Sequence, residues 1–190
     1  MTTPPDSASV LQQFERFGLG NFPVKILGIR GHDLNAGAPG VNDMGIFDDL
    51  FCRCIGDMVT SFRGSTDPGR HYILNPINPD GCARLQIGLW WYQLGTHRGR
   101  PALVQAAPVT VDRLDRKGNK VGEGRGYFGI NHHSAGSEEE VGRYSAGCQV
   151  THCPEGPWGA TWQKYFEPTA TAVRLHGQKR IPYLLVDAKS

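Results

Sequence analysis

The sequence predicts a mostly β (α+β) fold, with a short N-terminal helix and a helical segment near the C-terminus. Several short segments alternate between apolar and polar residues and are separated by turn-forming residues, as strands are. Only two segments show helical spacing. Gly and Pro together make up 38 of 190 residues, which suits strands and loops but falls short of the ~25–30% typical of disordered chains.

The length of 190 residues fits one domain. We find no internal repeat and no linker, and expect an N-terminal helix or arm over residues 1–20 and a single domain over residues 21–190. Residues 7–17 (SASVLQQFERF) predict an amphipathic helix capped by Asp6 or Ser7, because Val10, Leu11, Phe14 and Phe17 share one stripe.

The next segments predict strands and loops. Residues 23–29 alternate as a strand does, and residues 31–45 are a loop rich in Gly, Asn and Asp. Residues 46–61 fit either a helix or a pair of strands. Residues 63–69 (RGSTDPG) predict a tight turn, since Asp-Pro-Gly combines one fixed and one free φ.

The second half continues in strands, with one helix near its end. Strands are expected over 83–92, 102–106, 109–114, 127–131 and 181–186, with a hairpin turn at 115–119. Trp90, Trp91 and Tyr92 cannot all face inward on a strand, so one should be exposed or line a cleft. Residues 158–175 have helical spacing, which Pro168 should break or kink, and Gly177 fits a C-cap.

Charge and cysteine usage exclude several classes of protein. Twenty Lys and Arg against eighteen Asp and Glu leave a formal charge of +2, too little excess for a nucleic-acid binder. No apolar run is long enough to span a membrane, and residues 1–9 show no secretory signal, so we expect synthesis in the cytoplasm. Five cysteines without paired CxxC motifs predict free thiols and no structural zinc. No metal and no cofactor are expected.

Residues 129–150 (GINHHSAGSEEEVGRYSAGCQV) carry the chemistry. Cys148 follows His133 by 15 residues, and a nucleophilic thiol needs a base within reach plus a group that fixes the tautomer of that base. The small residues before Cys148 let backbone amides, near Gly147 and Cys148, approach a substrate carbonyl as an oxyanion hole. His132 and His133 point to opposite faces of a strand, so only one can be the base. We take His133, with His132 as the alternative.

The pairing of His133-Ser134-Ala135 with Ser145-Ala146-Gly147-Cys148 resembles the catalytic motif of the L,D-transpeptidases (YkuD-type), a His followed by Ser-His-Gly-Cys. The resemblance implies an L,D-transpeptidase-like β-sandwich or barrel and a cysteine enzyme acting on peptidoglycan peptide stems through a thioacyl intermediate. It implies that the carbonyl of Ser134 orients the His133 ring. Further residues are implied to shape the thiol pocket or bind substrate: Ser145, Gly147, Gln149, His132 and His97.

The sequence departs from that family in two places. Ala146 stands where the family has a second His, and Gln149-Val150 replaces its usual residues after the Cys. With no export signal, these departures favour a hydrolase over a wall-building transpeptidase. We expect an endolysin- or effector-like enzyme that acts in the periplasm or cell wall after delivery by phage or secretion machinery, with an immunity protein as a partner.

Other interpretations stay open. A non-catalytic phage, virion or wall-binding module could retain a decayed site. A zinc peptidase could use His132 and His133 with Cys148, His152 and Cys153, although no HExxH motif is present. The triplet Glu138–Glu140 is read as a solvated acidic tip, or as a contact for a cationic stem amine. His97, with Arg98 and Arg100, is placed either on the surface or in the substrate groove.

Overall fold

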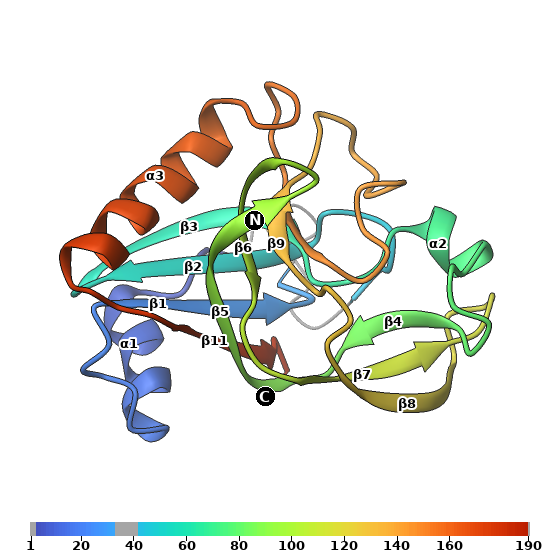
Figure 1. Cartoon of the computed structure of the whole chain (residues 1–190), viewed down its shortest axis with the longest axis horizontal. Helices are drawn as coiled ribbons and strands as arrows, with labels where there is room; N and C mark the ends of the chain where they lie inside the picture. The colour runs from blue at the N-terminus through green and yellow to red at the C-terminus, as the bar shows by residue number, and fades with distance from the viewer. Residues whose placement is uncertain (1–2, 33–41, 190) are drawn as a thin grey trace.

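The computed structural model describes residues 3–32 and 42–189. Eight strands close a mixed barrel in the order β1-β11-β5-β6-β9-β10-β3-β2 (Figure 1). Two neighbouring pairs, β1–β11 and β9–β10, are parallel, and the others are antiparallel. The barrel strands are β1 (Val24–Arg30), β2 (Asp49–Ile55), β3 (Met58–Ser65), β5 (Gly88–His97), β6 (Arg100–Gln105), β9 (His132–Ser134), β10 (Gln149–Thr151) and β11 (Ile181–Asp187).

A small antiparallel sheet and three helices complete the described chain. The sheet has the order β4-β7-β8 and lies beside the barrel (Figure 1). Its strands are β4 (Cys82–Leu85), β7 (Val109–Leu114) and β8 (Lys120–Gly126). The helices are α1 (Ser7–Arg16), α2 (Arg70–Leu74) and α3 (Ala160–Leu175). In the described ranges, no helix has both the length and the apolar character needed to cross a membrane.

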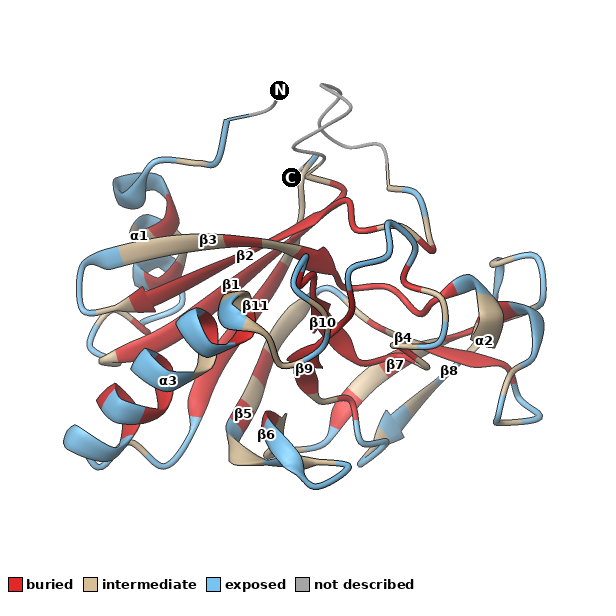
Figure 2. Ribbon diagram, turned by 90° about the horizontal axis from the view of Figure 1, so that it is seen from above, coloured by how far each residue is buried: buried red, intermediate tan, exposed pale blue. Residues whose placement is uncertain are grey.

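Strands β1 and β2 are buried on both faces (Figure 2). Successive residues of β1 show this, because Ile26 packs in one core cluster with the α3 side chains, whereas Leu27 packs in another with α1. The predicted N-terminal helix is confirmed. Asp6 accepts a hydrogen bond from the Ser9 amide at 2.9 Å, and Phe14 is fully buried. The outer faces of both helices remain exposed in Figure 2.

Most predicted strands are confirmed, and residues 46–61 hold β2 and the first half of β3, which is the strand pair and not the helix. Two expectations were wrong. The segment 83–92 is not one strand but two, β4 and β5, which belong to different sheets and separate at Gln86 and Ile87. Residues 127–131 form no strand, and Tyr127 is 67% exposed. The strand begins at His132 instead.

The C-terminal helix and the predicted turn also differ in detail. Helix α3 continues through Pro168. A proline leaves the carbonyl four residues earlier without its helical donor, and here Arg53 supplies one, with Nη1 2.6 Å from the oxygen of Lys164. Gly177, with φ +60°, follows the helix as expected. The predicted turn at 63–69 is partly strand, since β3 extends to Ser65. The predicted loop 31–45 lies mostly outside the described residues.

Candidate active site

His133 lies on β9 with one ring nitrogen bound and the other free. Its Nδ1 is 2.8 Å from the backbone oxygen of Ser134, which can only accept, so Nδ1 carries the proton. Nε2 is buried and has no hydrogen-bond partner among the residues that the structure describes, and the side chain is 4% exposed. The predicted role of the Ser134 carbonyl therefore matches the geometry, and the ring presents an unprotonated nitrogen without a hydrogen bond.

Cys148 ends a turn that its own residues stabilise. Ser145 Oγ donates to the Cys148 carbonyl at 2.7 Å and accepts the Gly147 amide at 3.1 Å. Gly147 has φ +130°, and a Cβ there would lie 2.7 Å from the backbone oxygen of Ala83. Glycine is thus required both by conformation and by close approach. The turn leads into β10, which pairs in parallel with β9 so that Val150 is opposite His133.

His97, at the end of β5, is the third member of the site. Its ring stacks on that of His133, with centroids 4.2 Å apart and planes inclined by 7°. One ring nitrogen of each histidine and Cys148 Sγ all lie within 4.8 Å of one another. Asn131 Nδ2 is 3.1 Å from His97 Nδ1, and Asn131 Oδ1 accepts the Gln105 amide. Because this fixes the Asn131 amide, His97 Nδ1 is the acceptor and Nε2 carries the proton.

Burial keeps both reacting groups neutral. It raises the pKa of the Cys148 thiol to about 11, an effect that the Asn131 amide and Arg98 oppose. Burial, and to a smaller extent the neighbouring His97, together lower the pKa of His133 to about 4. At neutral pH the pair is therefore a thiol and an imidazole. The imidazole is in its unprotonated form, which can accept a proton, and the sulfur has to lose its proton before it attacks.

A cleft of about 500 Å³ leads to His133. Trp158 also stacks on the His133 ring, with centroids 6.2 Å apart, and its backbone amide donates to Ser134 Oγ at 3.0 Å. Cys148 lies behind the lining and is 8% exposed. The cleft is lined by His97, Arg98, Arg100, His133, Ser134, Arg143, Tyr144, Pro157 and Trp158.

Backbone strain concentrates at this cleft. In the described ranges, two residues other than glycine have positive φ, Arg98 at +50° and Trp158 at +66°. Both line the cleft. Left-handed backbone is unfavourable for these residue types, and such conformations cluster at functional sites. The structure thus brings together Cys148, His133, Ser134, Ser145, Gly147 and His97, as the sequence predicted.

Two predicted site residues lie elsewhere. His132 points to the other face of β9, because strand residues alternate, and its ring nitrogens contact Thr151 Oγ1 and Tyr165 Oη. It is not the base. Gln149 is fully buried, and its Oε1 accepts the Tyr183 hydroxyl at 2.8 Å. The amide of Gln149 supports the core and does not face the cleft.

The ligand set expected for a zinc peptidase is not assembled. His152 packs on Phe47, and Cys153 Sγ lies 3.5 Å from the oxygen of Thr151 in the core. Within the part of the chain that the structure describes, one group of three side chains could hold a metal ion: His97, His133 and Cys148. A zinc ion would therefore occupy the atoms that the cysteine chemistry needs.

Two residues that shape the site, Trp158 and Asn131, are not recognisable as site residues from the sequence pattern. Trp158 was included in the predicted helix, but it precedes α3. Asn131 was placed in a strand, although its side chain aligns His97. The triplet Glu138–Glu140 does not line the cleft, and Glu139 pairs with Arg63 at 3.0 Å.

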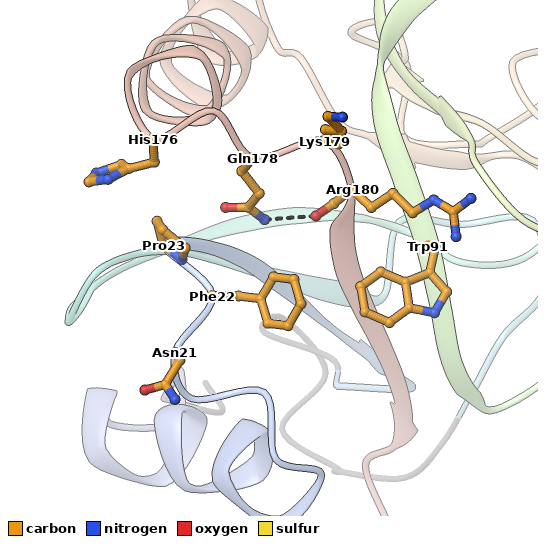
Figure 3. A pocket seen from close by; sticks show the side chains of 8 residues that line it. All are labelled: Asn21, Phe22, Pro23, Trp91, His176, Gln178, Lys179 and Arg180. Atoms are coloured by element: carbon orange, nitrogen blue, oxygen red, sulfur yellow. Dashed lines mark hydrogen bonds between the residues drawn. The ribbon is translucent and has the colours of Figure 1, made fainter.

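A separate cavity of about 700 Å³ lies between the segment before β1, strand β5 and the segment before β11 (Figure 3). Phe22 and Trp91 face each other across it, with ring centroids 5.6 Å apart. Trp91 is thus the cleft-lining aromatic expected in the segment 90–92. None of the residues around Cys148 lines this cavity. Its lining residues are Asn21, Phe22, Pro23, Trp91, His176, Gln178, Lys179 and Arg180.

Comparisons of the chain with protein-family models, with curated proteins and with solved structures found no match.

Proposed function

We propose that the protein is a cysteine enzyme that hydrolyses, or exchanges, an amide bond in the peptide stem of peptidoglycan. One observation carries the proposal. A ring nitrogen of His133 lies within 4.8 Å of Cys148 Sγ, while its Nδ1 is held by the Ser134 carbonyl. A nucleophile, a base and an orienting group in this order are what covalent amide cleavage requires. The substrate class is supported by the resemblance of the HSA…SAGC segment to the L,D-transpeptidases.

The reaction follows from the protonation states. His133 Nε2 accepts the thiol proton as Cys148 Sγ attacks the carbonyl carbon, and a carbon–sulfur bond forms. The carbon–nitrogen bond then breaks, and the leaving amine takes the proton from His133. Water attacks the carbonyl carbon of the resulting thioester and gives a proton to His133. The carbon–sulfur bond then breaks, the carboxylic acid leaves, and His133 returns the proton to the Cys148 sulfur. If an amine attacks instead of water, the outcome is exchange.

The oxyanion needs a hydrogen-bond donor near the sulfur. The Gly147 amide already donates to Ser145 Oγ, so the amide of Cys148 is the expected donor. Of the two backbone amides predicted to form the oxyanion hole, those near Gly147 and Cys148, only the Cys148 amide is left for this role. The delivered, endolysin- or effector-like role, with an immunity protein as partner, is part of the same proposal.

The experiment is digestion of purified sacculi with the wild-type protein and with Cys148→Ala, followed by mass spectrometry of the soluble muropeptides. Digestion in ¹⁸O-labelled water identifies hydrolysis by a heavy carboxylate. Cys153→Ala is the matched control, because burial raises the pKa of Cys153 to about 11 as well. Muropeptide release that survives Cys148→Ala would refute the proposal.

A non-catalytic wall-binding module is the second candidate. The observation that favours it is the pair of deeply buried, neutral reacting groups, together with the aromatic and basic cavity of Figure 3. Exposed aromatic rings beside polar groups are common in ligand sites. Wall binding that is lost in Trp91→Ala, unchanged in Cys148→Ala and never accompanied by a muropeptide product would favour this candidate.

A further inference from the structure

Three arginines line the cleft that leads to His133: Arg98, Arg100 and Arg143. All three are exposed, and none of the described residues that line the cleft is Asp or Glu. The ion pairs found within residues 3–32 and 42–189 involve other cations, namely Arg30, Arg63, Arg84 and Lys120. A concave site with one sign of charge concentrates ligands of the opposite sign.

The position of Arg98 is fixed by a strained turn. Arg98 and Gly99 form the two-residue connection between β5 and β6, and His97 pairs with Arg100 across it. Both turn residues have positive φ, +50° and +76°. Such turns favour Asn-Gly, so an arginine at the first position is unfavourable for the turn itself. The turn places Arg98 next to His97 in the chain and Arg100 opposite His97 on the neighbouring strand.

The charge of Arg98 reaches the reacting groups. It lowers the pKa of Cys148, of His133 and of His97. A negative group bound at the arginines would therefore lie close to the sulfur and to the imidazole. Guanidinium groups bind carboxylates in a bidentate geometry, which is the anion a peptide carries.

We propose that Arg98, Arg100 and Arg143 form a subsite for a carboxylate of the substrate, next to the carbonyl that Cys148 attacks. This inference rests on the proposed function and adds a substrate preference to it. The enzyme prefers peptide stems that carry a free carboxylate. The carboxylate is either the C-terminus of the stem or that of a side chain. This subsite is positively charged and binds an anion, whereas the contact considered for Glu138–Glu140 is negatively charged and would bind a stem amine.

The first test does not depend on amide cleavage. Iodoacetate and iodoacetamide share a leaving group and a size but differ by one negative charge, and both alkylate thiolates. The rate constants at Cys148 are measured by mass spectrometry of its peptide and expressed as a ratio. Because any change in the thiolate fraction affects both reagents equally, the ratio reports only the local charge.

We expect the ratio of iodoacetate to iodoacetamide at wild-type Cys148 to exceed that of free cysteine about 10-fold. The triple variant Arg98→Gln/Arg100→Gln/Arg143→Gln should return it to the value of free cysteine. The matched control changes the same net charge at exposed arginines away from the cleft and should keep the raised ratio: Arg116→Gln/Arg125→Gln/Arg174→Gln. An equal ratio in the wild type, an unchanged ratio in the cleft variant, or no reaction with either reagent would overturn the inference.

The second test uses synthetic stem peptides with free carboxylates, with an amidated C-terminus, or with amidated side chains. We expect one amidation to lower kcat/KM about 10-fold in the wild type and to have no effect in the cleft variant. The sensitive position identifies which carboxylate is bound. Equal cleavage of all three peptides by the wild type contradicts the subsite. If none is cleaved, the proposed function fails, and the alkylation ratio alone decides the subsite.

Discussion

His132 and His133 are adjacent on β9, yet their surroundings differ in kind. Both ring nitrogens of His132 have partners, Thr151 and Tyr165, and its ring packs 4.3 Å from that of Phe51. His133 has one bound nitrogen and one bare one, between the rings of His97 and Trp158. A buried histidine with both nitrogens satisfied supports packing. One that keeps a buried, unpartnered nitrogen beside a thiol is suited to catalysis.

Replacing each histidine alone gives the strongest test of this contrast. We expect His133→Gln to lower the rate of muropeptide release by about 100- to 10,000-fold, because the thiol loses its base. The melting temperature should change little. Initial rates on sacculi and a thermal melt measure the two effects. A His133→Gln protein with full activity would show that the bare nitrogen has no chemical role.

Acid should lower the free energy of unfolding because His132 and His133 are buried in their neutral forms. Burial lowers the pKa of His133 to about 4, against about 6.5 in the unfolded chain. Between these values the unfolded state binds more protons, so stability is complete above about pH 6.5 and falls as the pH drops towards 4. His133 accounts for about 3 kcal/mol of this loss, and His132 shifts in the same direction.

Urea denaturation at neutral pH and near pH 4 measures that loss. His133→Gln should reduce the difference between the two conditions by about 3 kcal/mol. An acid-induced loss of the same size in this variant and in the wild type would mean that His133 does not titrate with a lowered pKa.

His132→Phe tests the structural half of the contrast. The substitution leaves the buried Thr151 and Tyr165 hydroxyls without the imidazole, at a cost of about 1–3 kcal/mol for each group left unsatisfied. We therefore expect a lower free energy of unfolding in urea, with near-normal activity in the folded fraction. A folded His132→Phe protein that is inactive would remove the distinction between the two residues.

Inhibition by Zn²⁺ should give the smallest difference between a variant of the site and a variant of the core. Because His97, His133 and Cys148 offer three ligand atoms within 4.8 Å, added Zn²⁺ should inhibit release and a chelator should restore it, whereas the chelator alone should change nothing. Loss of one ligand in His97→Phe should weaken inhibition about 10-fold, and His132→Phe should leave it unchanged. Inhibition constants measured on the three proteins compare these effects, and activity lost to the chelator alone would favour a metalloenzyme.

Local patterns predicted much of the fold and the centre of the site. The alternation of strand residues separates His132 from His133, and small residues mark the turn at Cys148. The failures have physical reasons. Tyr127 and Phe128 look like a strand, but Phe128 instead packs on the Arg113 guanidinium at 4.9 Å. Pro168 stays in its helix because a distant arginine binds the freed carbonyl. The barrel closes where β1 pairs with β11, and these strands lie too far apart in the sequence for a local pattern to predict their pairing.

The group that orients the His133 ring is a main-chain oxygen. Any amino acid at position 134 carries that atom, so mutational drift there cannot delete it as it could delete an Asp or Asn side chain. What the serine adds is its hydroxyl, which accepts the Trp158 amide. Evolution could therefore vary position 134 to loosen or tighten the Trp158 wall, and so change which ligands enter, while the tautomer of the histidine is preserved.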